Sequence, residues 1–344
     1  MTSPNLSSTM ASTMIKITFA TLLLCLSGFV QARELLNVSY DVMRDFYKDL
    51  NPVFIKHWHT KTGETLTINM SHAGSTKQAR AVADGLQADV LTMNQATDLN
   101  MLAKIGNVIA PDWNKKFPDG AAPFTSTSVF IVRKGNPKAI KDWNDLIKPG
   151  VQVIIPNPKT AGNGRYTYLA AWAHALNQPG GNAAKAQEFV GKIFKNVPVL
   201  DAGGRAASTT FLQRGIGDVL VTFENEAEMI SREFGRGMLD VIYPSSSVLA
   251  EPPVAIVERD VGKRGNKEVA QAYMDFLWSP QAQEIAAQNY LRPRNPEIFK
   301  KYAAQFPAIK LYNVEKVFGS WDKAQQQHFA DGGTFDQIYQ PGTQ

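Results

Sequence analysis

The chain has 344 residues, of which 44% are hydrophobic and 19% are charged, the composition of an ordinary globular protein. It is too long for one compact core, so two domains are expected. The net charge of +5 is spread through the sequence without a run of Lys and Arg or interleaved aromatic residues, which argues against a nucleic-acid partner.

Residues 1–32 have the pattern of a secretory signal peptide. Lys16 precedes an apolar run over 17–30, and Val30 and Ala32 present the side chains that a signal peptidase reads. The run is too short to act as a membrane anchor. We therefore expect export to the periplasm, with either Met1 or Met14 as the true start. Cys25, the only cysteine, falls in this segment, so the mature chain would have no thiol, which fits an oxidising compartment.

The first part of the mature chain alternates strands and helices. We predict strands over 35–40, 66–70 and 89–93. A helix with an apolar stripe at Phe46, Leu50, Phe54 and Trp58 follows the first strand, and a helix over 76–86, capped by Ser75, follows the second. This alternation predicts a parallel sheet with right-handed crossovers, whose ligands gather at the carboxyl ends of the strands.

A second alternation begins after a long predicted strand over 125–133. It comprises predicted strands over 151–155, 197–200 and 218–222 and helices over 165–177, 183–195 and 207–214. An extended passage over 249–257 and helices over 267–278 and 280–290 return the chain to the first lobe. The predicted fold is thus α/β with two Rossmann-like lobes. Lobe I comprises 33–124 plus 250–344, and lobe II comprises 125–249, with a hinge and a cleft between them.

Four strand ends lead through a short turn into a helix. The clearest is Asn157-Pro158-Lys159-Thr160-Ala161-Gly162-Asn163-Gly164-Arg165-Tyr166, and similar turns occur at 71–75, 201–205 and 39–41. Glycine lets the backbone approach a guest closely, and the first N–H groups of a helix lack intrahelical acceptors. A single turn of this kind often has no ligand-binding role. Several helix starts of this kind in one chain favour a binding site for one small anion.

Enzymatic chemistry finds little support in the sequence, and neither catalytic residues nor a metal or cofactor is expected. His57 and His59 lie on different sides of their helix and cannot share a metal. Glu224, Glu226 and Glu228 are interpreted as a solvated helix start. The sequence contains no Gly-x-Ser-x-Gly elbow, phosphate loop or His-Glu-x-x-His motif.

Several motifs closely resemble the periplasmic sulfate-binding proteins of ABC importers. They lie at 37–41, 71–79, 157–160, 215–220 and 328–333, and the resemblance extends over the whole mature chain. Residues 94–98, 162–163, 165–168 and 222–224 are more similar to the thiosulfate-binding branch. The resemblance implies the type II periplasmic binding fold and a monomeric receptor that delivers thiosulfate or sulfate to membrane permease subunits.

The resemblance also implies which residues hold the anion. In this family neutral donors bind the dianion, mainly backbone N–H groups, which would belong here to Asp41, Ser75, Gly162, Asn163 and Gly204. The Ser75 hydroxyl is a further candidate donor. Ala161 and Phe223 occupy the positions of two side-chain donors of the sulfate branch, and Arg165 and Arg205 would support the site from behind, with surface solvation as the alternative.

The chemistry of thiosulfate suits these two replacements. Its terminal sulfur is larger than oxygen and a poorer acceptor, so a methyl group and an aromatic ring cost it less than they cost sulfate, which loses about 0.5–1.5 kcal/mol per hydrogen bond. Two alternatives stay open. The same scaffold could bind another oxyanion such as molybdate, or the chain could be an exported hydrolase of sulfur esters.

Overall fold

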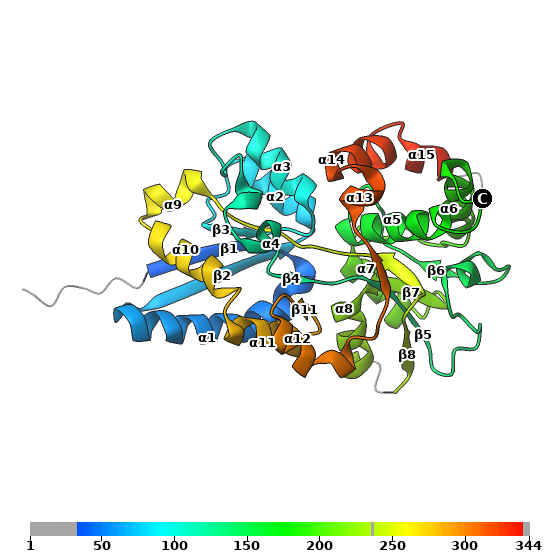
Figure 1. Cartoon of the computed structure of the whole chain (residues 1–344), viewed down its shortest axis with the longest axis horizontal. Coiled ribbons are helices and arrows are strands. Elements are labelled where there is room, and N and C mark those ends of the chain that lie inside the picture. The colour runs from blue at the N-terminus through cyan, green and yellow to red at the C-terminus, as the bar shows by residue number, and fades with distance from the viewer. Residues whose placement is uncertain (1–32, 235–236, 340–344) are drawn as a thin grey trace, which may run out of the picture.

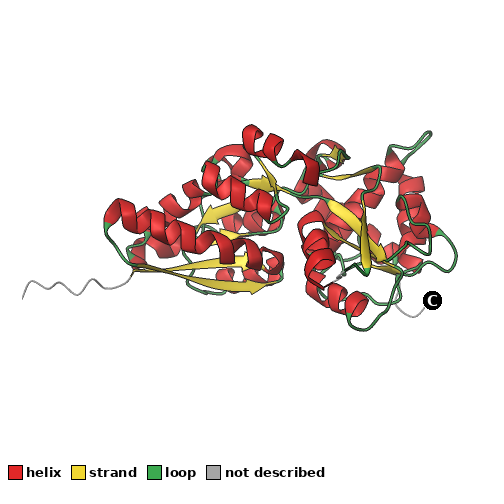
Figure 2. Cartoon of the chain, turned by 90° about the horizontal axis from the view of Figure 1, so that it is seen from below, coloured by secondary structure: helices red, strands yellow, loops and turns green. Residues whose placement is uncertain are grey.

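The computed structural model describes residues 33–234 and 237–339 and consists of two lobes side by side (Figures 1 and 2). The predicted signal peptide, residues 1–32, lies outside the described residues. Each lobe is built on a four-stranded sheet, and extended segments join the two. The two-lobed α/β fold predicted from the sequence is confirmed.

The first lobe carries a sheet in the order β10-β3-β1-β2. Its elements are β1 (Arg33–Tyr40), α1 (Arg44–Thr62), β2 (Leu66–Ala73), α2 (Ser75–Ala83), β3 (Val90–Thr92), α3 (Ala96–Ile105), α4 (Pro118–Ala121), β10 (Val254–Ile256), α9 (Glu258–Arg264), α10 (Lys267–Phe276), α11 (Pro280–Gln288) and α12 (Pro296–Lys301). Strands β1, β2 and β3 are parallel, as predicted, whereas β10 joins β3 antiparallel. Helix α3 was not predicted.

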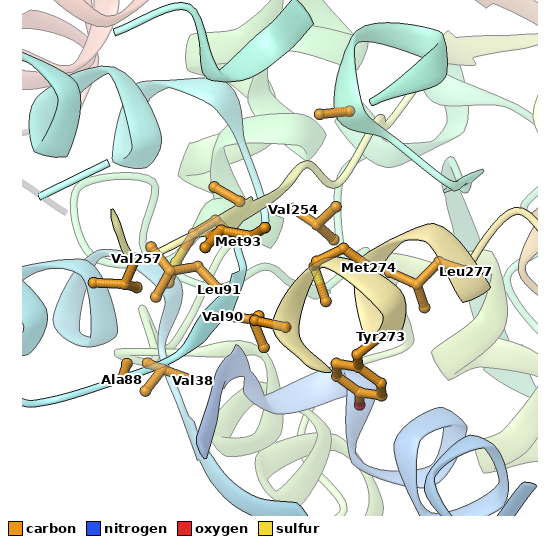
Figure 3. Close-up of a cluster of buried hydrophobic side chains, with 14 of the residues drawn as sticks. Val38, Ala88, Val90, Leu91, Met93, Val254, Val257, Tyr273, Met274 and Leu277 are labelled. Atoms are coloured by element: carbon orange, nitrogen blue, oxygen red, sulfur yellow. The ribbon is translucent and has the colours of Figure 1, made fainter. Parts of the chain in front are cut away.

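The core of this lobe forms between the sheet and its helices. The predicted stripe of α1 is buried, with Leu50 and Phe54 fully inaccessible. Val38, Leu91 and Val254 of three neighbouring strands belong to the same buried cluster as Tyr273 and Met274 of α10 (Figure 3). Burial of such side chains stabilises the fold by roughly 1.5–3 kcal/mol each, so this core fixes the strand ends that line the cleft.

The second lobe has a mixed sheet in the order β6-β7-β5-β8. Its elements are β5 (Ser128–Arg133), β6 (Val153–Ile154), α5 (Gly162–Leu176), α6 (Ala183–Lys195), α7 (Gly204–Leu212), β7 (Val219–Phe223), α8 (Glu224–Met229) and β8 (Leu239–Ile242). Strand β5 runs antiparallel to β7 and β8, whereas β6 runs parallel to β7, so the parallel arrangement predicted for the first three strands of the chain does not extend to the whole of this sheet. The predicted strand over 197–200 is irregular, and hydrogen bonds to the β6 segment come from the residues on either side of it, Asn196 O with Val153 N–H and Asp201 O with Asn157 N–H.

Three segments cross between the lobes, where the sequence predicted two. Strand β4 (Phe124–Thr125) pairs with β11 (Arg292–Pro293), Ser126 bridges to Ala250, and β9 (Ser246–Val248) pairs with β12 (Lys310–Tyr312). The remaining short elements are the 3-10 helices η1 (Asp41–Met43), η2 (Trp113–Lys115), η3 (Trp143–Ile147) and η5 (Ala303–Gln305) and the π-helices η4 (Ile230–Phe234) and η6 (Gln325–Phe329).

The C-terminal segment packs on the second lobe rather than the first. Helices α13 (Val314–Phe318), α14 (Trp321–Ala324) and α15 (Thr334–Ile338) lie beside α5 and α6 (Figure 1). Trp321 and Phe335 belong to the same buried cluster as Tyr166 of α5, because the apolar faces of these short helices need a partner surface. This packing differs from the predicted division, which placed all of 250–344 in lobe I.

His328 gives this packed segment a pH dependence. The ring is 1% exposed and lies within hydrogen-bonding distance of the Tyr168 hydroxyl, with Nδ1 3.0 Å from Oη. Burial lowers the pKa of His328 from 6.5 to about 4. Between pH 6.5 and pH 4, His328 is therefore protonated in the unfolded chain but neutral in the folded chain. The free energy of unfolding is at its full value above about pH 6.5 and decreases as the pH falls toward 4.

We expect the wild-type protein to lose about 2–3 kcal/mol more stability between pH 7.5 and pH 4.5 than a His328→Gln variant. Urea unfolding of both proteins at the two pH values measures the difference. Equal losses in the two proteins would show that His328 is not the titrating group.

Candidate anion-binding site

Four helix starts meet at one small cavity between the lobes. The first lobe contributes Asp41, which begins η1 and leads into α1, and Ser75, which begins α2; the second contributes Gly162 of α5 and Gly204 of α7. The space, named here the interlobe cavity, is about 30 Å³ and is lined by Tyr40, Asp41, Val42, Gly74, Ser75, Asn94, Thr160, Ala161, Gly162, Asn163, Ala202, Gly203 and Gly204.

The five residues predicted to offer backbone donors all line this cavity. The first N–H groups of a helix have no intrahelical acceptor, and the helix dipole adds positive potential at the same end. A cavity volume of about 10–15 Å³ is enough for a single water, so the interlobe cavity, at about 30 Å³, suits a guest somewhat larger than one water. Such an arrangement can hold a small anion without a positively charged side chain.

Glycine is required at the start of α5 because a side chain approaches Gly162 closely and a backbone carbonyl approaches Gly164. A Cβ atom at Gly162 would lie 2.2 Å from Asn94 Oδ1, and one at Gly164 would lie 2.2 Å from the carbonyl oxygen of Pro156. Asn94 follows β3 of the first lobe, and its carbonyl oxygen also accepts a hydrogen bond from the Tyr166 hydroxyl at 3.3 Å. The lobes are therefore in contact beside the cavity.

The Ser75 hydroxyl is used within the first lobe, which differs from two predictions. It donates to a carboxylate oxygen of the buried Asp98 and accepts the backbone N–H of Asn94 at 2.8 Å. Gly74, rather than Ser75, occupies the N-cap position of α2, and Ser75 makes no capping hydrogen bond. With its donor committed to Asp98, the hydroxyl holds the helix start in place, and its backbone N–H remains the group that can serve an anion.

Asn163 is held by a polar network behind the cavity. Its Nδ2 donates to Thr222 Oγ1 at 2.8 Å and to Glu226 Oε2 at 3.4 Å. Glu226 also accepts a hydrogen bond from Ser208 Oγ at 3.0 Å. Burial raises the pKa of Glu226, which the hydrogen bond from Thr222 opposes. The network fixes the first turn of α5 relative to α7 and β7.

The acidic residues after β7 are not a solvated helix start. Glu224 is fully buried and forms a two-bond ion pair with Arg292 of β11, whereas Glu226 lines a wider cleft of about 260 Å³ that adjoins the cavity. The prediction that Glu224 and Glu226 are solvated is therefore wrong. The end of β7 lies between the lobes, so the helix start that follows it is covered by other parts of the protein.

The two predicted supporting arginines lie outside the interlobe cavity. Arg165 is 5% exposed and donates to the carbonyl oxygens of Pro158 and Lys159 at 2.9 and 3.2 Å, so it braces the loop before α5. Arg205 lines the wider cleft together with Asp41. Burial raises the pKa of Asp41, and the positive charge of Arg205 counters that shift.

Ala161 and Phe223, which occupy the positions of two side-chain donors of the sulfate branch, lie in different surroundings. Ala161 lines the cavity, as expected for a residue that faces the anion. Phe223 is 2% exposed, packs edge-on against Tyr166 with ring centroids 5.5 Å apart, and is not among the lining residues. Asn94 also lines the cavity without having been predicted as a site residue, although its position just after a strand end is the same signal that indicated Asp41 and Ser75.

Within residues 33–234 and 237–339, no three His, Cys, Asp or Glu residues are grouped to hold a metal ion. No helix in these ranges combines the length and apolar character needed to span a bilayer.

Comparison with known proteins defines the class. The family model described as bacterial extracellular solute-binding protein matches residues 35–292, which is more than half of the chain. The sulfate-binding protein SubI from Mycobacterium tuberculosis has the same fold, with a TM-score of 0.78 and 31% identity over 86% of this chain and 99% of that one. The chain belongs to the bacterial extracellular solute-binding proteins.

Curated relatives narrow this class. A thiosulfate-binding protein of Pseudomonas aeruginosa is 63% identical over 319 residues, covering 92% of this chain and 96% of that protein. A sulfate-binding protein of Escherichia coli is 53% identical, covering 89% and 92%, and a thiosulfate-binding protein of the same organism is 48% identical, covering 93% and 95%. Within its family the chain is a member of the sulfate- and thiosulfate-binding group, which confirms the resemblance seen in the motifs.

Proposed function

We propose that this protein is the periplasmic receptor of an ABC importer and that it captures thiosulfate or sulfate in the interlobe cavity. The observation that carries the proposal is the meeting of Asp41, Ser75, Gly162, Asn163 and Gly204, from both lobes, around one small space. The relatives named for these two anions support the same ligand class. The receptor catalyses no reaction and hands its ligand to permease subunits in the membrane.

Closure of the lobes follows from the division of donors between them. Each lobe alone presents only part of the set, so the liganded closed form gains contacts that the open form lacks. Because the donors are uncharged N–H groups, a fully ionised dianion is matched, whereas the proton of hydrogen phosphate would need a buried acceptor. Leaving such a group unsatisfied costs about 1–3 kcal/mol.

Titration calorimetry on protein stripped of ligand tests this proposal. Thiosulfate and sulfate should bind, and phosphate at pH 7 should bind about 5- to 150-fold more weakly than the better of the two. Tighter binding of molybdate or phosphate would favour the alternative oxyanion receptor. Turnover of a chromogenic sulfate ester by the purified protein would favour the hydrolase instead.

A further inference from the structure

Asn94 lines the interlobe cavity and is held from both lobes by its backbone. The residue is 3% exposed and lies just beyond β3. Its N–H donates to Ser75 Oγ in the first lobe, and its carbonyl oxygen accepts from Tyr166 Oη in the second. The backbone is therefore fixed, and the side-chain amide is the polar group left to find partners.

The two ends of this amide lie in different surroundings. Oδ1 is buried, has no hydrogen-bond partner among the residues that the structure describes, and lies so close to Gly162 that a Cβ atom there would be 2.2 Å away. The amide nitrogen, which carries two N–H donors, is on the other branch of the same planar group. With Oδ1 turned to Gly162, that branch is left for the cavity that Asn94 lines.

Buried amide groups in folded proteins nearly always have hydrogen-bond partners. The hydroxyls of Ser75 and Tyr166 are already bonded to the Asn94 backbone, and no hydrogen bond links the Asn94 amide nitrogen to a residue in the described ranges. The cavity that Asn94 lines is therefore where an acceptor for this nitrogen can lie. An acceptor placed in the cavity, such as an anion oxygen or sulfur, would complete the donor set of Asn94. The donor is neutral, like the helix N–H groups around it.

We propose that Asn94 is a ligand-contacting residue whose side-chain nitrogen donates a hydrogen bond to the bound anion; this inference rests on the proposed function. Asn94 comes from the first lobe, while Gly162, against which its oxygen lies, comes from the second. Closure therefore sets the orientation of the amide as well as the size of the cavity. Asn94 thus links recognition of the anion to the approach of the two lobes.

Two substitutions test this assignment by calorimetry with thiosulfate and sulfate. Asn94→Leu keeps the approximate volume and removes the donors, and it should weaken binding about 10- to 100-fold because hydrogen bonds to charged groups are strong. Asn94→Asp places a carboxylate beside the dianion and should weaken binding at least about a hundredfold. The matched control is Asn114→Asp, which makes the same charge change at an exposed position outside the cavity and should stay within about twofold.

The melting temperature without anion separates a folding defect from a binding defect in each variant. A crystal structure of the wild-type protein with thiosulfate provides a second readout, in which Nδ2 should lie within about 3.5 Å of an anion atom. A longer separation from every anion atom, or wild-type affinity in both folded Asn94 variants, would overturn the assignment. Failure of the wild-type protein to bind either anion would instead overturn the proposed function.

Discussion

Replacing Gly162 by alanine is expected to weaken thiosulfate binding about 5- to 150-fold. The added Cβ would lie 2.2 Å from Oδ1, 2.6 Å from Cγ and 3.1 Å from Cβ of Asn94, so the whole short side chain is in the way. Asn94 is buried and tied through its backbone, so the lobes have to separate to relieve the clash. Overpacking of this kind costs about 1–3 kcal/mol, and the closed, anion-binding form alone bears that cost.

Calorimetry with thiosulfate measures the loss, and unfolding without anion should show little change because the open form tolerates the methyl group. Gly191→Ala is the matched control. A Cβ at Gly191 in α6 would meet only the Ile338 side chain at 3.7 Å, an ordinary contact remote from the cavity. Wild-type affinity in the Gly162 variant would mean that the contact between Asn94 and Gly162 is not part of the binding form.

Removing Arg292 is expected to destabilise the protein by about 3–5 kcal/mol at pH 7. Its Nε and a terminal guanidinium nitrogen lie 2.6 and 2.8 Å from the two carboxylate oxygens of Glu224, and the second nitrogen also reaches the Pro307 carbonyl oxygen at 3.1 Å. The Glu224 side chain is 0% exposed, so Arg292→Met leaves its carboxylate buried without compensation. The pair joins α8 to β11 beside the crossing segments, so the loss falls on the connection between the lobes.

Urea unfolding of Arg292→Met, Glu224→Gln and the double variant measures this effect and the coupling of the two residues. Burial raises the pKa of Glu224, and without Arg292 no positive charge opposes it. The variant should therefore regain stability as the pH falls, because its folded state binds the proton more tightly than its unfolded state does.

Lys301→Met serves as the control for a lost positive charge. Lys301 pairs with Glu284 on the surface, where its side chain is 58% exposed, and solvent and salt screen such pairs so that they contribute little to stability. A loss in Arg292→Met no larger than in Lys301→Met would show that the buried pair contributes little to the stability of the junction.

Several features of the fold follow from the sequence because they depend on neighbouring residues. The apolar spacing of α1, the alternation of strands and helices, and the glycine-containing turns before α2, α5 and α7 are local patterns. A helix start exposes its N–H groups wherever it occurs, so the four turns could be named as candidate anion-binding turns from local pattern. The resemblance to the sulfate-binding proteins indicated which residues in these turns would donate. Their gathering in one cavity followed from the rule that ligands collect at strand ends.

Other features depend on parts of the chain that are far apart. Glu224 meets Arg292 across 68 positions, and the Ser75 hydroxyl meets Asp98 across 23, so neither partner could be read from local pattern. The packing of 314–338 on α5 and α6 also required the folded surface of the second lobe.

The sequence by itself determined the class of fold, the helix starts that can bind an anion and the glycines that such close approaches require. The tertiary structure alone decided which acidic and polar side chains are buried, which partner each one has, and that Asn94 meets Gly162 across the cleft. The physical reason is that backbone conformation responds mainly to adjacent residues, whereas burial and hydrogen-bond partnership are set by whichever surfaces the folded chain brings together.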